Sequence, residues 1–147
     1  MRWRIRNNGR TERGAAAVEF AFVVIPLLFI ICMIVNFGVI FAQQLSLDNA
    51  TRAAARAGVV DTDPPADVSA RAEDEFASTI ARTSAGDLDI TFPGDAGDSC
   101  EGSEFGDMLA VRAEVTTDVV IPWIFPDAVL PDSFDLESEA AFQCEFN

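Results

Sequence analysis

Three residue types are missing from this chain of 147 residues, which contains no histidine, no tyrosine and no lysine. Without histidine, the chain lacks the commonest general base of enzymes and the commonest metal ligand. A serine or cysteine nucleophile with a histidine base is therefore excluded, and no Gly-rich phosphate-binding loop is found. We expect a protein that is not an enzyme and that uses no cofactor or metal.

Positive charge is scarce and unevenly distributed. Residues 1–14 carry five Arg against Glu12, whereas residues 43–147 carry five Arg against 22 acidic residues, a net charge of about −17. Phosphate binding needs clustered basic residues, so the acidic part speaks against a nucleic-acid partner. The basic start suits the cytoplasmic side of a membrane segment, because Arg next to a span holds that side inside.

A long apolar run follows this basic start. As a helix, residues 15–42 would extend about 42 Å, which exceeds the roughly 30 Å hydrocarbon core of a bilayer. Secretory signal peptides have shorter apolar regions, so we favour a retained transmembrane helix over signal-peptidase cleavage after Ala42. Pro26 removes one backbone hydrogen bond inside the run, which predicts a helix kink near Phe22.

Glu19 is an acidic residue at the start of the apolar run. A carboxylate at the bilayer centre costs up to about 2.5–3.5 kcal/mol on insertion scales, and less toward the interface. Such a residue is a functional hypothesis that needs a positively charged partner. The simpler alternative is that Glu19 reaches back to the lipid headgroups or to Arg13.

The residues around Glu19 form a known pattern. Gly14 is followed by four residues, Ala15-Ala16-Ala17-Val18, and then by Glu19 and an apolar helix, which resembles the type IV prepilin processing site. In that family a prepilin peptidase cuts after the glycine on the cytoplasmic side. The resemblance implies a cut between Gly14 and Ala15. The partner of Glu19 would then be the new α-amino group, its own or that of Ala15 in a neighbouring subunit.

A closer resemblance covers residues 13–58. The basic leader, Pro26, Asn36-Phe37-Gly38 and the Ala/Arg-rich stretch 48–58 make this part similar to the TadE-like family of minor pilins or pseudopilins. These proteins belong to the tight-adherence (Tad, type IVc) pilus machinery. One departure is Asn36, where an acidic residue is common in such proteins; a subunit contact at that position would be uncharged here.

The resemblance also implies partners and a location. The partners would be a prepilin peptidase, other pilins and minor pilins, the pilus assembly platform and the lipid bilayer. The chain would cross the cytoplasmic membrane once, with its N-terminus inside and its C-terminal domain outside, and would act in a cell-surface pilus for adhesion.

The helix is expected to continue beyond the membrane to about residue 58. Small apolar residues recur there at helical spacing, and a small-residue face suits close packing on a domain or a neighbouring helix. Gly58 is a candidate C-cap. Asp48 precedes Arg52 by four residues, the favourable order for an ion pair of about 0.2–0.5 kcal/mol. The stripe consists of Leu47, Ala50, Ala54 and Ala57, widened by Leu45, Ala53 and Ala55.

The remaining chain predicts one more helix and a small sheet. The helix covers residues 67–82, and alternating apolar residues predict strands over residues 87–92, 108–120 and 134–146, separated by loops over 93–106 and 121–131. We therefore predict an α+β, pilin-like fold, with a sheet of three or four antiparallel strands packed against the helical part. Its parts are a leader over 1–14, a transmembrane helix over 15–42 and an extracytoplasmic domain over 59–147.

Three cysteines are present. Cys32 lies in the apolar run as a filler. If the C-terminal domain is extracytoplasmic, Cys100 and Cys144 form a disulfide that adds roughly 2–4 kcal/mol of stability. The acidic loop over 93–106 has carboxylates for calcium, but their spacing does not fit the helix-loop-helix calcium signature, so we favour a solvated loop.

Two other functions stay open on the sequence alone. The first is an unprocessed bitopic membrane protein with an extracytoplasmic binding domain. The second is a secreted enzyme or ligand binder that is released by cleavage after Ala42. The N-terminus of the mature chain separates both from the pilin hypothesis.

Overall fold

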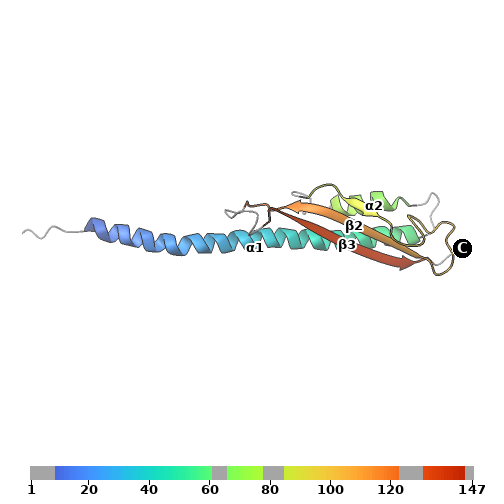
Figure 1. Ribbon diagram of the computed structural model, residues 1–147, viewed down its shortest axis with the longest axis horizontal. Coiled ribbons are helices and arrows are strands. Elements are labelled where there is room, and N and C mark those ends of the chain that lie inside the picture. The colour runs from blue at the N-terminus through green and yellow to red at the C-terminus, as the bar shows by residue number, and fades with distance from the viewer. Residues whose placement is uncertain (1–8, 61–65, 78–84, 123–130, 145–147) are drawn as a thin grey trace, which may run out of the picture. The chain divides into compact units, whose positions relative to one another are not determined.

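The computed structural model describes residues 9–60, 66–77, 85–122 and 131–144. Two helices, α1 (Gly9–Val59) and α2 (Val68–Ala77), precede the three strands of one sheet (Figure 1). The strands are β1 (Asp89–Thr91), β2 (Met108–Asp118) and β3 (Ser133–Gln143). The predicted α+β class with a long N-terminal apolar helix is confirmed.

The chain divides into two compact units, Met1–Val35 and Asn36–Asn147. Within the first unit, α1 is helical without interruption through Pro26. The kink that the sequence suggests near Phe22 stays a prediction.

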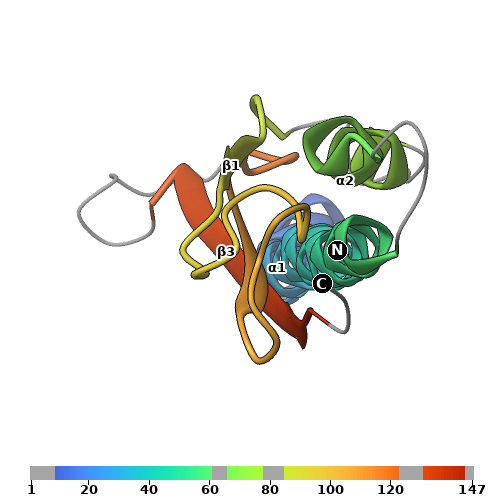
Figure 2. The ribbon, with the colours of Figure 1, turned by 90° about the vertical axis from the view of Figure 1, so that its right-hand side faces the viewer.

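The second unit is built around the outer part of α1, from Asn36 to Val59. The sheet has the order β1-β2-β3 with both pairs antiparallel. Figure 2 shows α2 lying beside α1, with the strands on one side of the two helices. The core joins these elements through two neighbouring clusters of buried side chains. One contains Leu47, Ala50, Phe76, Ala113, Val115 and Leu136, and the other contains Ala54, Ala55, Val68, Ala72, Val111 and Ala140.

The strands follow the predicted alternation. Leu109, Val111, Ala113 and Val115 of β2 are buried, whereas Glu114 between them is exposed. This pattern arises because successive side chains of a strand point to opposite faces. The register pairs Val111 with Ala140 and Val115 with Leu136, so the inward rows of both strands meet α1.

The element bounds differ modestly from the predictions. The strand expected over 87–92 is shortened to Asp89–Thr91, and the one expected over 108–120 ends at Asp118. The last strand begins one residue earlier, at Ser133, and ends at Gln143. Residues 78–82 of the expected second helix and most of the expected loop over 121–131 lie outside the described residues.

Gly58 is not the C-cap that the sequence suggests. It lies inside α1, which ends one residue later, and the only described residues with positive φ are Gly97, Gly102 and Gly106. A Cβ at Gly58 would lie 2.5 Å from Leu109 Cδ2 and 2.7 Å from Val68 Cγ2. Glycine is therefore needed here because β2 and α2 approach the backbone of α1 closely.

Two further local predictions are wrong. Leu45 is 53% exposed and does not widen the buried stripe of α1. Asp48 accepts a hydrogen bond from Gln44 Nε2 at 3.2 Å instead of pairing with Arg52. The stripe is confirmed at Leu47, Ala50, Ala54 and Ala55, which are fully buried, whereas Ala53 and Ala57 are half-buried.

The predicted disulfide is confirmed. Cys100 and Cys144 are bonded, with a Cα–Cα distance of 5.7 Å and a sequence separation of 44 residues. Both cysteines are buried and pack against Leu109. The bond ties the acidic loop to the end of β3, where the Cys144 amide also donates to the Asp107 carbonyl at 2.9 Å.

Candidate processing and assembly site

The first unit presents an apolar helix surface that nothing in the described chain covers. None of its most apolar 18-residue stretch is buried. A contiguous apolar surface of this size marks contact with a membrane or another protein. The large apolar side chains exposed by 40–77% are Val18, Phe20, Phe22, Val23, Ile25, Leu27, Leu28, Ile30, Ile31, Ile34 and Val35.

Gly14 lies within α1 at the start of this surface. A Cβ added at Gly14 would meet no atom within 4 Å, and the backbone is not in the left-handed region. Glycine inside a helix costs about 0.5–1 kcal/mol relative to alanine. The packing of the described residues therefore does not explain why a glycine stands at this position.

Glu19 lies one helical turn beyond Ala15. Both residues are exposed, and their separation of four positions places them on the same helix face, about 6 Å apart along the axis. Glu19 forms no ion pair with any side chain that the structure describes. The side chain of Arg13, the alternative partner, lies outside the described residues. Among the described side chains, Glu19 thus has no positively charged partner.

Asn36 joins the outer part of α1 to the segment that follows β2. Its Nδ2 donates to the Ile121 carbonyl at 2.9 Å, and its Oδ1 accepts from the Ile121 amide at 2.9 Å. Asn36 is only 1% exposed. The Asn36 side chain is thus used within this chain, and both of its polar atoms are hydrogen-bonded.

Two more buried polar pairs hold α1 on the sheet. Thr117 Oγ1 donates to Gln43 Oε1 at 2.5 Å, and the hydroxyls of Thr51 and Ser138 lie 3.0 Å apart. Gln43, Thr51 and Thr117 are fully buried. Buried polar pairs must be satisfied to be tolerated, so they fix one register of the helix on the strands.

The sequence contains a signal for these anchors that the apolar stripe alone misses. Moving back from Leu47 in steps of four and three residues reaches Gln43, Ile40 and Asn36, which continue the same helix face. Ile40 packs against the core cluster around Leu47, while the other two are polar. A pattern restricted to apolar residues therefore ends too early.

The residues that the structure describes contain no group of three or more Cys, Asp or Glu that could hold a metal ion, and this includes the whole acidic loop over 93–106. The calcium alternative for that loop gains no support.

These features first define a class of protein. α1 is long and apolar enough, over Gly14–Val59, to cross a membrane, and the described chain has one such helix. It fits a single-pass membrane protein with an α+β domain outside the bilayer.

The comparisons with known proteins then point to a family. Residues 14–56 match the model of the TadE-like protein family. The match begins at Gly14 and covers Glu19, Pro26, Asn36 and the Ala/Arg-rich part of α1, so the resemblance of this segment is confirmed. No curated protein and no solved structure matches the chain.

Proposed function

We propose that this chain is a minor pilin or pseudopilin-like subunit in the biogenesis of a Tad (type IVc) pilus. A prepilin peptidase removes residues 1–14, and the mature subunit assembles by packing of its apolar helix. One observation carries the proposal: Glu19 is an exposed carboxylate one turn beyond Ala15 on an apolar helix, it pairs with no side chain that the structure describes, and it lies in the segment that matches the TadE-like family.

Cleavage after Gly14 would supply a positively charged partner for Glu19. It creates an α-amino group at Ala15, and this positive charge can pair with Glu19 of the same or a neighbouring subunit. The attraction between two opposite charges grows as the dielectric constant falls, so it is strong in a lipid or helix-packed layer. Only subunits in the correct axial register would satisfy both groups, while the apolar side chains supply close packing.

The N-terminal leader sets the orientation in this proposal. Its five Arg hold the leader in the cytoplasm, where the peptidase acts, and the disulfide-bonded domain lies outside. The subunit waits in the cytoplasmic membrane and then joins a pilus or primes its assembly. The role is structural, as expected for a chain without histidine.

Secretion by cleavage after Ala42 is disfavoured by the fold of the second unit. The cut would remove Asn36, whose side chain pairs with both backbone groups of Ile121, and Ile40, which packs against the core. The unprocessed bitopic protein keeps these contacts, but it gives no reason for a glycine at position 14.

Gly14→Leu tests the proposal with a matched control. A Cβ added at Gly14 would meet no described atom within 4 Å, so the variant should still insert and form its disulfide. It should accumulate with the leader attached, because the peptidase can no longer accept the residue before the cut. Gly38→Leu changes another glycine of α1 where an added Cβ would meet no atom within 4 Å, and this variant should be processed normally. Intact-mass spectrometry of both variants gives the answer, and normal maturation of Gly14→Leu would show the proposal to be wrong.

A further inference from the structure

The outward face of the sheet is strongly acidic. Six exposed acidic residues point away from α1, with Arg112 as the basic residue among them. The register places Asp89 opposite Glu114 and Glu114 opposite Glu137, and like charges in directly opposite positions destabilise a sheet. Arg112 offsets part of this through ion pairs with Glu114 and Glu137. We call this surface the acidic face; it consists of Asp89, Glu114, Asp118, Asp135, Glu137 and Glu139.

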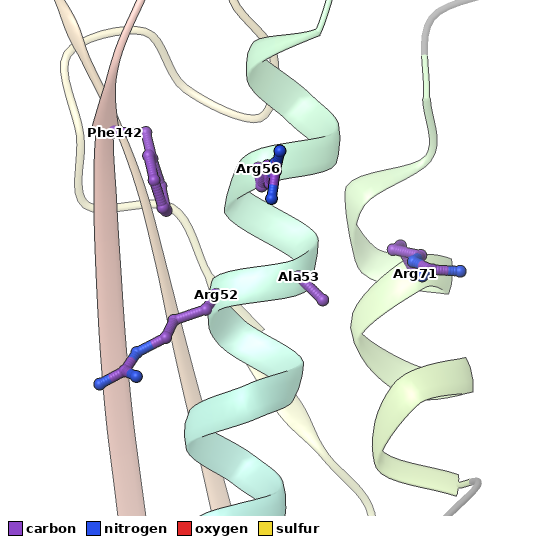
Figure 3. A pocket seen from close by; sticks show the side chains of 5 residues that line it. All are labelled: Arg52, Ala53, Arg56, Arg71 and Phe142. Carbon is purple, nitrogen blue, oxygen red and sulfur yellow. The ribbon is translucent and has the colours of Figure 1, made fainter.

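A basic groove lies on the helical side of the same domain. Arg52 and Arg56 of α1, Arg71 of α2 and Phe142 of β3 line a groove of about 460 Å³ (Figure 3). Three of the five Arg in residues 43–147 thus line the same groove. Arg52 and Arg56 are four residues apart, a like-charge spacing that destabilises a helix. We call this surface the arginine groove.

The described part of the chain uses little of this positive charge. Arg52 and Arg56 form no ion pair with any side chain that the structure describes, and Asp48 is hydrogen-bonded to Gln44. Arg71 lies 3.5 Å from Glu75, but both side chains are well exposed, and such surface pairs contribute little. The arginine groove can therefore accept carboxylates from a second molecule.

On β3, the two surfaces include residues from opposite faces of the strand. Phe142 belongs to the inward-facing row of β3, whereas Asp135, Glu137 and Glu139 belong to the outward row, because alternate side chains of a strand point to opposite faces. Their spacing also matches. Carboxylates two residues apart on a strand are about 6.6–6.8 Å apart along the strand. Arg52 and Arg56 are about 6 Å apart along α1.

We propose that the arginine groove of one copy binds the acidic face of a second copy of this chain. Guanidinium groups bind carboxylates through paired, charge-assisted hydrogen bonds, which gives the contact its geometry. A contact between two different faces is heterologous, so it repeats into a ring or an open helical array. The inference rests on the proposed function, since it describes how ectodomains meet in an assembly.

The contact would also reduce the electrostatic repulsion between two acidic ectodomains. Two ectodomains with a charge of about −17 each repel one another. A pairing that brings the arginine groove against carboxylates offsets part of this repulsion, so the groove would favour one orientation of the partner.

A charge-swap experiment tests the contact. Two differently tagged copies of the full chain are co-expressed, extracted in detergent, and the capture of one by the other is measured. Arg52→Glu/Arg56→Glu in both copies should lower capture about tenfold, as should Asp135→Arg/Glu137→Arg in both. When both changes are made in both copies, every groove and every face carries the reversed charge, and capture should be restored. Raised salt should weaken capture of the unaltered chain.

Matched variants separate the contact from net charge and from misfolding. Glu101→Arg/Glu104→Arg adds the same charge in the exposed loop, outside both surfaces, and should not lower capture. The neutral variant Arg52→Gln/Arg56→Gln should also lower capture, and disulfide formation reports folding of every variant. Unchanged capture for both groove variants, or no restoration in the combined variant, would overturn the inference.

The same samples distinguish this inference from the proposed function. Their intact mass shows whether the leader is removed at Gly14. Correct maturation with no effect of the charge swap removes only the groove contact. A chain that keeps its leader contradicts the proposed function, whatever the capture shows.

Discussion

Gly58 and Gly38 lie in the same helix but in different surroundings. A Cβ at Gly58 would collide with the buried side chains of Leu109 and Val68, whereas a Cβ at Gly38 would meet nothing within 4 Å. Gly58→Ala should therefore destabilise the domain by about 1–3 kcal/mol, the usual cost of overpacking a core. The free energy of unfolding in urea, followed by circular dichroism, measures the change. Gly38→Ala should leave it unchanged or raise it, and equal stability of the two variants would contradict the packing role.

Glu19 is the residue whose charge the proposed function uses. Glu19→Gln keeps the size of the side chain and removes the charge, so insertion in the membrane should be unaffected. Without the pairing to the α-amino group of Ala15, the amount of subunit in sheared pili should fall. Glu19→Ala should behave the same way, because the charge and not the side-chain volume sets the register. Piliation at the normal level in both variants would mean that the carboxylate has no role in assembly.

At the scale of elements, the outer part of α1 is an integral part of the domain. Asn36→Ala would leave the amide and carbonyl of Ile121 without their present partner, and an unmade buried hydrogen bond costs about 1–3 kcal/mol. The melting temperature of the detergent-solubilised chain should therefore fall. Asn49→Ala, an exposed asparagine of the same helix, is the matched control and should stay within about 0.5 kcal/mol of the unaltered chain. Similar effects of both would rule out the anchoring role of Asn36.

The elements were largely predictable, while their contacts were not. The stripe Leu47–Ala50–Ala54 and the alternation in β2 are local patterns, so they predict a helix face and a strand directly. Asn36 and Gln43 escape such patterns because polar residues do not mark a core, and their partners lie far along the chain. A glycine at position 58 is compatible with a helix C-cap and with close packing of another element on the helix. Only the position of Leu109 in the fold distinguishes these two roles. The arginine groove is lined by residues of three elements, so the sequence of any one segment does not predict it.

The disulfide was predictable for a different reason. Only two cysteines lie beyond the apolar run, so an oxidising location leaves one intramolecular pairing. The structure adds its place, between the acidic loop and the end of β3, where both cysteines are buried against Leu109.

For the whole molecule, the two units divide the tasks of the proposed subunit. The first unit carries the processing site and an apolar helix surface open to lipid or to other helices. The second unit carries the acidic face and the arginine groove on a domain fixed to α1 by buried polar pairs. Helix packing would hold the assembly together, and the charged surfaces would choose the neighbour.

The central claim is that the chain is matured between Gly14 and Ala15. Intact-mass spectrometry of the chain purified from the membranes of its native host tests this most directly. We predict a mass that corresponds to a chain starting at Ala15, with or without an added methyl group, and with one disulfide. A mass that corresponds to a start at Met1 or at Gln43 would contradict the account.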